Sequence, residues 1–293
     1  MLRLIVLILY ILFFPLSAVE VTMQDLRLAQ KKINHNPSIG RERTRIITKE
    51  RNQEYPHSNV LVLNTTPEDK ECCIISYASY NKTYPQLLQF LLGRLKNTFK
   101  GHVLYRIGGW PNMENGCLAH SDCPYGFKAC AFQEAYDLGY KKVLWLDALL
   151  NPVKDLTPLF DAIEANTAMY RYDAYFSEKF ITQNVLDAFN LTFDEVKSCK
   201  HMAAGIFGLN FHNPIAVDFL NAWHESEVTK KMGYFSFIPE QIPLSILLLQ
   251  FNLDNCGFHD PYLLIIGKVT SKDQDFFFEW DPIRKTTHPS KWK

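Results

Sequence analysis

Hydrophobic and polar positions follow two rhythms from residue 72 onward. Short apolar runs rich in β-branched residues predict buried strands, and apolar residues that recur every three or four positions predict amphipathic helices. The predicted strands are CCIISYAS (72–79), HVLYRI (102–107), KVLWLD (142–147), AMYRYDAYF (168–176) and GIFGLNF (205–211). The predicted helices cover 85–99 and 127–138 and begin at Thr157-Pro158 and Asn213-Pro214. This alternation predicts an α/β fold with a mainly parallel sheet and helices on both faces.

Two different segments precede this pattern. Residues Leu4 to Leu16 are almost continuously apolar, follow Arg3 and are followed by small residues, as in a secretory signal peptide. The run is shorter than the roughly 20 residues that cross a bilayer comfortably. Residues 1–18 are therefore predicted to be a signal peptide, with a short uncleaved anchor as the alternative. Residues 19–69 are predicted to be a basic lead-in or stalk, because 29–58 is polar and aperiodic and carries seven Lys/Arg against three Glu.

Composition and charge narrow the class of protein. Hydrophobic residues make up 47% and charged residues 21%, which excludes wholesale disorder. Lys+Arg and Asp+Glu are equal at 31 each. A chain without net positive charge has no global field to hold a polyanion, which argues against a dedicated nucleic-acid binder.

Cysteines and sequons bear on the compartment. The seven cysteines allow at most three internal disulfides and leave one thiol over, and Cys117 with Cys123 is the favoured pair. Asn64, Asn81 and Asn190 each begin an Asn-x-Thr sequon. With the signal segment, these features predict a secreted, disulfide-containing glycoprotein if the source is a eukaryote.

Candidate chemistry gathers where a predicted strand ends. In an open α/β sheet, ligands bind at the carboxyl ends of the strands, and Asp147 ends the apolar strand KVLWLD. The alternative is that Asp147 caps the following turn. Asp155 precedes the helix start at Thr157-Pro158 and is better explained as a cap or a partner of the helix dipole.

Three stretches carry a resemblance to a known family. Residues 124–164 resemble the segment around the Asp-x-Asp motif of GT-A-type glycosyltransferases, the nucleotide-diphospho-sugar transferases. Residues 201–223 look like their later strand and helix, and 240–251 (EQIPLSILLLQF) is similar to the helix that follows. The resemblance covers about residues 70–265, so 70–293 is predicted to be a glycosyltransferase-like domain on a Rossmann-like sheet.

The resemblance implies a role for several residues. Asp147 matches the first acid of the motif, which contacts the ribose or holds a divalent cation that bridges the pyrophosphate. By the same match, Ser76 and Tyr77 hold the base and ribose of the donor, and Lys128 reaches its diphosphate. Glu240 matches the general base of the family, and Gln241 beside it contacts the donor. His259 matches a metal ligand late in the chain. Each position also has a structural explanation, as a core aromatic, a solvated lysine, a helix-start acid or a surface histidine.

The chain departs from the motif at its second acid. Leu149 stands where that acid is expected, and it removes one metal ligand. The site then recruits another ligand, acts without metal or is inactive. Mn²⁺ or Mg²⁺ is therefore a weakened expectation, whereas a nucleotide-sugar donor remains the expected cosubstrate.

Two functions remain open, besides a less favoured phosphoryl- or nucleotidyl-transfer enzyme. The first is a hexosyltransferase that moves a hexose from a nucleotide-diphospho-sugar to a hydroxyl of a glycan or protein. The alternative is a catalytically inactive relative that binds sugar or glycan. Either is expected in the secretory pathway, or in the periplasm or at the cell surface if bacterial. Membrane contact is expected only through an uncleaved N-terminal segment.

Overall fold

The computed structural model describes residues 58–78, 84–107, 125–175, 181–230, 232–236, 239–259, 264–265 and 278–280. The predicted signal segment, the Asn81 sequon and the predicted pair Cys117–Cys123 lie outside these residues. In the described part of the chain, no helix is both long and apolar enough to cross a bilayer.

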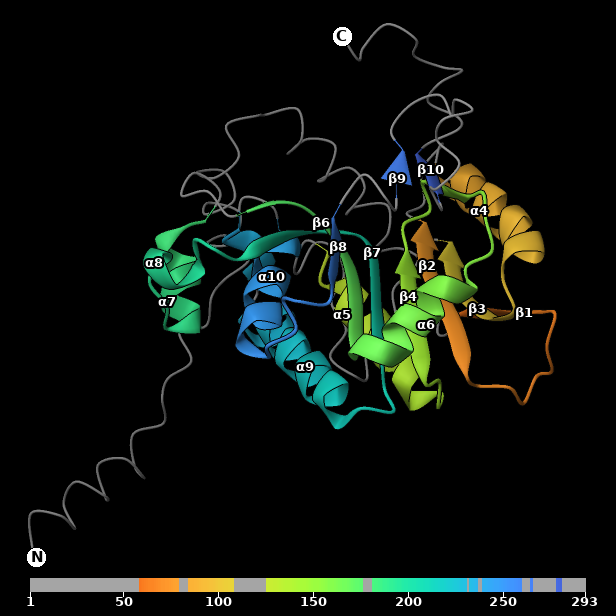
Figure 1. Cartoon of the computed structure of the whole chain (residues 1–293), viewed down its shortest axis with the longest axis horizontal. Helices are drawn as coiled ribbons and strands as arrows, with labels where there is room; N and C mark the ends of the chain where they lie inside the picture. Colours follow the sequence, from red (N-terminus) through yellow and green to blue (C-terminus); the bar gives the residue numbers. More distant parts are fainter. Residues whose placement is uncertain are drawn as a thin grey trace, which may run out of the picture.

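The apolar runs predicted as strands form the middle of one sheet (Figure 1). Within the described residues this sheet has the strand order β1-β3-β2-β4-β7-β6-β8. Its strands are β1 (Asn59–Leu63), β2 (Cys72–Ala78), β3 (Gly101–Ile107), β4 (Lys142–Leu146), β6 (Ala168–Tyr175), β7 (Lys200–Asn210) and β8 (Gly257–His259). A smaller sheet joins β5 (Leu150–Pro152), β10 (Phe278–Trp280) and β9 (Leu264–Ile265).

The α/β class is confirmed, and the sheet is mixed rather than mainly parallel. Strands β3, β2 and β4 are parallel neighbours, and β6 pairs in parallel with β8. Strand β1 is antiparallel to β3, and β7 is antiparallel to both β4 and β6. A parallel neighbour needs a crossover back to the starting edge. The chain instead enters β7 at the edge where β6 ends, with residues 176–199 between them, so β7 runs in the opposite direction.

Helices cover both faces of the sheet, as predicted. They are α4 (Tyr84–Thr98), α5 (Phe127–Asp137), α6 (Thr157–Asn166), α7 (Gln183–Phe189), α8 (Phe193–Val196), α9 (Pro214–His224) and α10 (Gln241–Gln250). Successive strand residues point to opposite faces. In β4, Trp145 therefore packs with α5, α9 and α10, whereas Leu144 and Leu146 pack with α4 and α6. Helices α7 and α8 form a third apolar cluster with part of α10.

Strand β1 lies within the range predicted as a basic lead-in. All five of its residues pair with β3, from Asn59 opposite Tyr105 to Leu63 opposite Gly101. Ser58, just before the strand, donates its backbone N–H and its hydroxyl to the carboxylate of Glu134 on α5, at 3.1 and 2.7 Å. Residues 58–63 therefore belong to the folded sheet.

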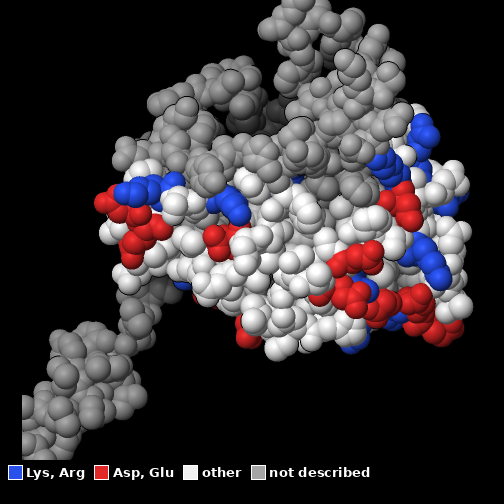
Figure 2. Space-filling view, in the orientation of Figure 1, with Lys and Arg blue, Asp and Glu red and all other residues white. Residues whose placement is uncertain are grey.

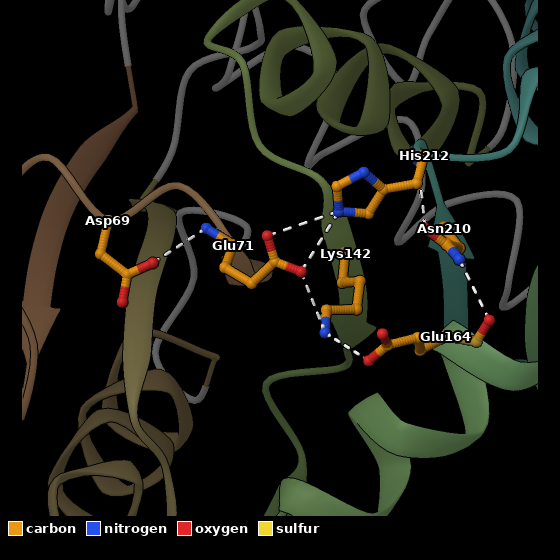
Figure 3. Close-up of polar contacts among 6 residues, drawn as sticks. All are labelled: Asp69, Glu71, Lys142, Glu164, Asn210 and His212. Carbon is orange, nitrogen blue, oxygen red and sulfur yellow. Dashed lines mark hydrogen bonds and ion pairs between the residues drawn. The ribbon is translucent and has the colours of Figure 1, made fainter.

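A polar network closes the edge of the sheet where β2 and β4 begin (Figure 3). Lys142, at the start of β4, forms ion pairs with Glu71 at 3.0 Å and with Glu164 of α6 at 2.8 Å. His212, just after β7, lies 3.2 Å from the same Glu71 carboxylate. This network joins four segments, the starts of β2 and β4, helix α6 and the residues after β7, at the edge opposite the one where β4 ends.

Five cysteines lie in the described part of the chain, and no disulfide joins any two of them. They are Cys72, Cys73, Cys130, Cys199 and Cys256, and four of them are buried. The expected disulfides are therefore absent among these five residues. On the surface, acidic and basic side chains both occur on the face shown in Figure 2, with acidic ones gathered over α6.

Candidate active site

Asp147 stands immediately after β4, at the edge of the sheet predicted from the sequence. Its backbone N–H donates to the Gly205 carbonyl of β7 at 3.0 Å, and its own carbonyl accepts from the Leu150 N–H at 3.0 Å. Its side chain is 28% exposed, so the carboxylate is open to solvent on one side. Asp155 lies just before α6, and its carboxylate accepts from the N–H and hydroxyl of Thr157, the first residue of that helix, at 3.0 and 2.9 Å.

The Asp147 carboxylate is held by two neighbours. The indole N–H of Trp145 donates to Oδ1 of Asp147 at 2.7 Å. The ammonium group of Lys128, on α5, lies 3.3 Å from the same oxygen. Trp145 and Asp147 share one face of the strand because side chains alternate along it.

Lys128 is buried at the centre of the site, with its side chain 4% exposed. Its ammonium contacts the Ala204 carbonyl at 2.8 Å, Glu240 at 3.1 Å and Asp147 at 3.3 Å. Burial alone would lower the pKa of Lys128, but the two carboxylates outweigh it and raise the pKa above its usual value. The lysine is thus charged, and each of its three N–H bonds has an oxygen neighbour. It is not the solvated surface lysine that was the alternative explanation from the sequence. To reach a diphosphate it would have to release one of these neighbours.

Glu240 joins the same cluster from the start of α10. Its side chain is 6% exposed and pairs with Lys128, and it forms no cap hydrogen bond with its own helix. Asp147 and Glu240 therefore meet at one ammonium although they are far apart in sequence. Gln241 is the first residue of α10 and is half-buried, and its carbonyl accepts from the hydroxyl of Ser245 at 2.6 Å.

Ser76 and Tyr77 lie beside this cluster, at the end of β2. The hydroxyl of Ser76 donates to the Leu146 carbonyl at 2.7 Å and so ties the ends of β2 and β4 together. The ring of Tyr77 packs against Phe127 with centroids 4.8 Å apart, and Phe127 lies 5.9 Å from Trp145. An aromatic row thus connects Tyr77 to the ring that holds Asp147.

A narrow crevice, with room for about one water molecule, lies next to Ser76 and Tyr77. It lies between the ends of β2 and β3 and α5, and sequence reasoning missed its charged residues. Arg106, 4% exposed, pairs with Glu134 at 3.0 Å on its wall. The available signal was a lone arginine near the end of the apolar run HVLYRI. The lining residues are Ser58, Ile75, Ser76, Tyr77, Leu104, Arg106, Phe127, Ala131 and Glu134.

The described residues do not by themselves form a divalent-cation site. Among them, no group of three His, Cys, Asp or Glu side chains lies close enough to hold a metal. Leu149 is buried in the core, 6% exposed, so its position supplies no ligand. His259 ends β8, where its backbone pairs with Tyr172, and its side chain lies outside the described part. Asp147 alone offers one partly exposed carboxylate, whereas Mn²⁺ or Mg²⁺ needs several oxygen ligands.

Comparisons with known proteins give a resemblance of limited extent. No family model and no curated protein sequence matches the chain. Among solved structures, the galactosyltransferase LgtC in complex with donor and acceptor sugar analogues is 11% identical, with 72% of this chain and 87% of that chain covered and a TM-score of 0.35. Mouse xyloside xylosyltransferase 1 in its apo form is 11% identical, with 71% and 91% covered and a TM-score of 0.39.

A third similar structure is a glycosyltransferase involved in the glycosylation of the major capsid of PBCV-1. It is 13% identical, with 72% of this chain and 92% of that chain covered and a TM-score of 0.44. All three of these structures are glycosyltransferases. At these TM-scores and identities, they assign neither a family nor an activity to it.

Proposed function

We propose that this chain is a glycosyltransferase that moves a hexose from a nucleotide-diphospho-sugar to a hydroxyl acceptor on a glycan or protein. The single observation that carries the proposal is the place of Asp147. Its partly exposed carboxylate follows β4, next to the end of the parallel strand β2, where ligands of open α/β sheets bind. Residues 124–164, which include this strand, also resemble the Asp-x-Asp segment of GT-A-type glycosyltransferases.

The proposal gives each residue a task. Tyr77, near the end of β2, faces the base and ribose, and Ser76 keeps the ends of β2 and β4 together beside them. Asp147 accepts from a ribose hydroxyl of the donor. Lys128 keeps Asp147 and Glu240 in one place, Glu240 stands on the acceptor side, and Gln241 contacts the donor. The described side chains form no site for a divalent cation, and these tasks need none.

A second function is favoured by a specific observation. Leu149 is packed into the core, so the expected second acid is replaced by a residue that serves stability. A chain with this change could bind a sugar or glycan without transferring it. For both functions we propose the secretory pathway, or the periplasm or cell surface if the source is bacterial, because of the apolar segment Leu4 to Leu16.

Thermal unfolding in the presence of a panel of UDP- and GDP-sugars, with and without Mn²⁺, separates the two. A ligand present at 100 times its dissociation constant stabilises the folded state by about 2.7 kcal/mol. A transferase is expected to be stabilised by at least one nucleotide sugar and to release its nucleoside diphosphate when an acceptor is added. A folded protein that is stabilised by glycans but by no nucleotide sugar would be the binding module.

A further inference from the structure

Trp145 forms a hydrogen bond with Asp147 that its packing in the hydrophobic core does not explain. The residue is 2% exposed and belongs to the same core cluster as Phe127 and Trp223. Its indole N–H leaves that apolar environment to donate to Oδ1 of Asp147 at 2.7 Å. The face of the indole lies under the ammonium of Lys128, which is 5.0 Å from the ring centroid.

These contacts use only one oxygen of the Asp147 carboxylate. The indole N–H and the Lys128 ammonium both approach Oδ1. Among the described residues, no hydrogen bond or ion pair engages Oδ2. Rotation about the last bond of an aspartate is soft, so a carboxylate without a fixed partner exchanges its two oxygens easily. A hydrogen bond from a rigid, buried ring prevents this exchange.

We propose that Trp145 is a positioning residue of the candidate site: its indole N–H holds Oδ1 of Asp147 so that Oδ2 is free to accept from a ribose hydroxyl of the bound nucleotide. This role rests on the proposed function. Lys128 cannot hold the carboxylate alone, because its ammonium is shared with Glu240 and the Ala204 carbonyl. Trp145 thus supports Asp147 from within its own strand.

The chain offers a matched pair of substitutions for the test. Trp145→Phe keeps an aromatic ring and removes the N–H. Trp223→Phe makes the same change at a tryptophan that is 1% exposed in the same core cluster. The Trp223 indole nitrogen has no hydrogen-bond partner among the described residues. Both variants lose similar packing, but only the first loses the contact with Asp147.

The experiment combines indole N–H NMR resonances with binding of UDP, or GDP if UDP does not bind, by isothermal titration. We expect Asp147→Asn to move the Trp145 resonance and to leave that of Trp223 in place. We expect Trp145→Phe to bind the nucleotide about tenfold more weakly or worse, since a hydrogen bond to a charged group is lost, and Trp223→Phe to bind as the wild type.

The other outcomes count against separate parts of the account. Equal affinity of the two Trp→Phe variants, in a protein that binds UDP or GDP, overturns the positioning role and leaves the proposed function standing. A folded wild type that binds neither nucleotide overturns the proposed function, and the role of Trp145 with it. If Trp145→Phe does not fold, a titration of the wild type with the nucleotide, followed by NMR, is the test. The indole N–H resonance that responds to Asp147→Asn is expected to move as the nucleotide binds, and a resonance that stays in place overturns the positioning role.

Discussion

The ammonium of Lys128 lies 3.1 Å from the carboxylate of Glu240, which follows it by 112 residues in the chain. Both side chains are buried, and the pair joins α5 to the start of α10 beside the end of β4. A buried ion pair contributes little net stability as a pair, but breaking it leaves an uncompensated buried charge. Lys128 therefore contributes both to the stability of the fold and to the geometry of the candidate site.

Replacing Lys128 alone is expected to destabilise the protein strongly. Lys128→Met leaves Glu240 buried without its partner, which typically costs about 3–5 kcal/mol of the free energy of unfolding. The double variant with Glu240→Gln is expected to recover part of this loss. Urea unfolding measures both, with Lys197→Met as the control, because its pair with Asp194 is exposed to solvent and contributes little to stability. A Lys128→Met variant as stable as Lys197→Met would show that the buried pair does not form.

Two glycines are expected to respond in opposite directions to alanine. A Cβ on Gly208 in β7 would overlap the buried side chain of Ile163, with Cγ1 only 2.7 Å away, so Gly208→Ala is expected to cost about 1–3 kcal/mol. A Cβ on Gly93 in α4 would meet nothing within 4 Å. Gly93→Ala is expected to stabilise by about 0.5–1 kcal/mol, because alanine loses less conformational entropy in a helix. Ile163 belongs to α6, so equal denaturant midpoints for Gly208→Ala and Gly93→Ala would contradict the close packing of α6 against β7.

The network in Figure 3 predicts an acid-dependent contribution to stability. Burial alone would raise the pKa of Glu71, but Lys142 and His212 outweigh it and lower the pKa below its usual 4.5. A carboxylate with a lowered folded-state pKa stabilises the fold above its unfolded-state pKa, and this stabilisation is lost as pH falls through the folded-state pKa. Glu71→Gln is thus expected to be less stable than the wild type at pH 6, with the difference shrinking below about pH 4.5.

Urea unfolding at several pH values between 3 and 7 tests this, with the exposed Glu68, in the turn that precedes Glu71, changed to Gln as the control. The control is expected to follow the pH dependence of the wild type. A stability difference between Glu71→Gln and the wild type that stays constant across this range would exclude Glu71 as the group responsible.

The buried thiols are expected to resist modification in the folded protein. Cys199 is 1% exposed, its thiol donates to the Ser245 carbonyl at 3.0 Å, and burial raises its pKa to about 12. Cys72 is half-buried, and its pKa is raised to about 11, chiefly by burial. Because the thiolate is the reactive form, iodoacetamide at pH 8 should label Cys72 before Cys199. Peptide mass spectrometry measures this order, and early labelling of Cys199 would contradict its burial beside α10.

The sequence predicted the central strands and the helices against them because their apolar periodicity is strong. Strand β1 and the short strands β5, β8, β9 and β10 were missed, since two to five residues carry too little pattern to separate from a polar or irregular stretch. The direction of β7 was also missed, because a strand's pattern does not record the edge from which the chain enters it.

The same division holds within the candidate site. Asp147 could be placed because the end of an apolar strand identifies an edge of the sheet. The meeting of Lys128 with Glu240, and the pairing of Arg106 with Glu134, depend on how helices separated in sequence pack together. Trp145 was hidden for another reason: a tryptophan in a buried strand is explained by packing alone, and nothing in the pattern shows where its N–H points.

The most direct test of the account is nucleotide binding by Asp147→Asn, with the exposed Asp161 of α6 changed to Asn as the control. If Asp147 accepts from a ribose hydroxyl of the bound nucleotide, the wild type and the control gain thermal stability with the same UDP- or GDP-sugar. The Asp147→Asn variant, folded and at the same ligand concentration, is expected to lose most of this gain. An undiminished gain in Asp147→Asn would contradict the central claim.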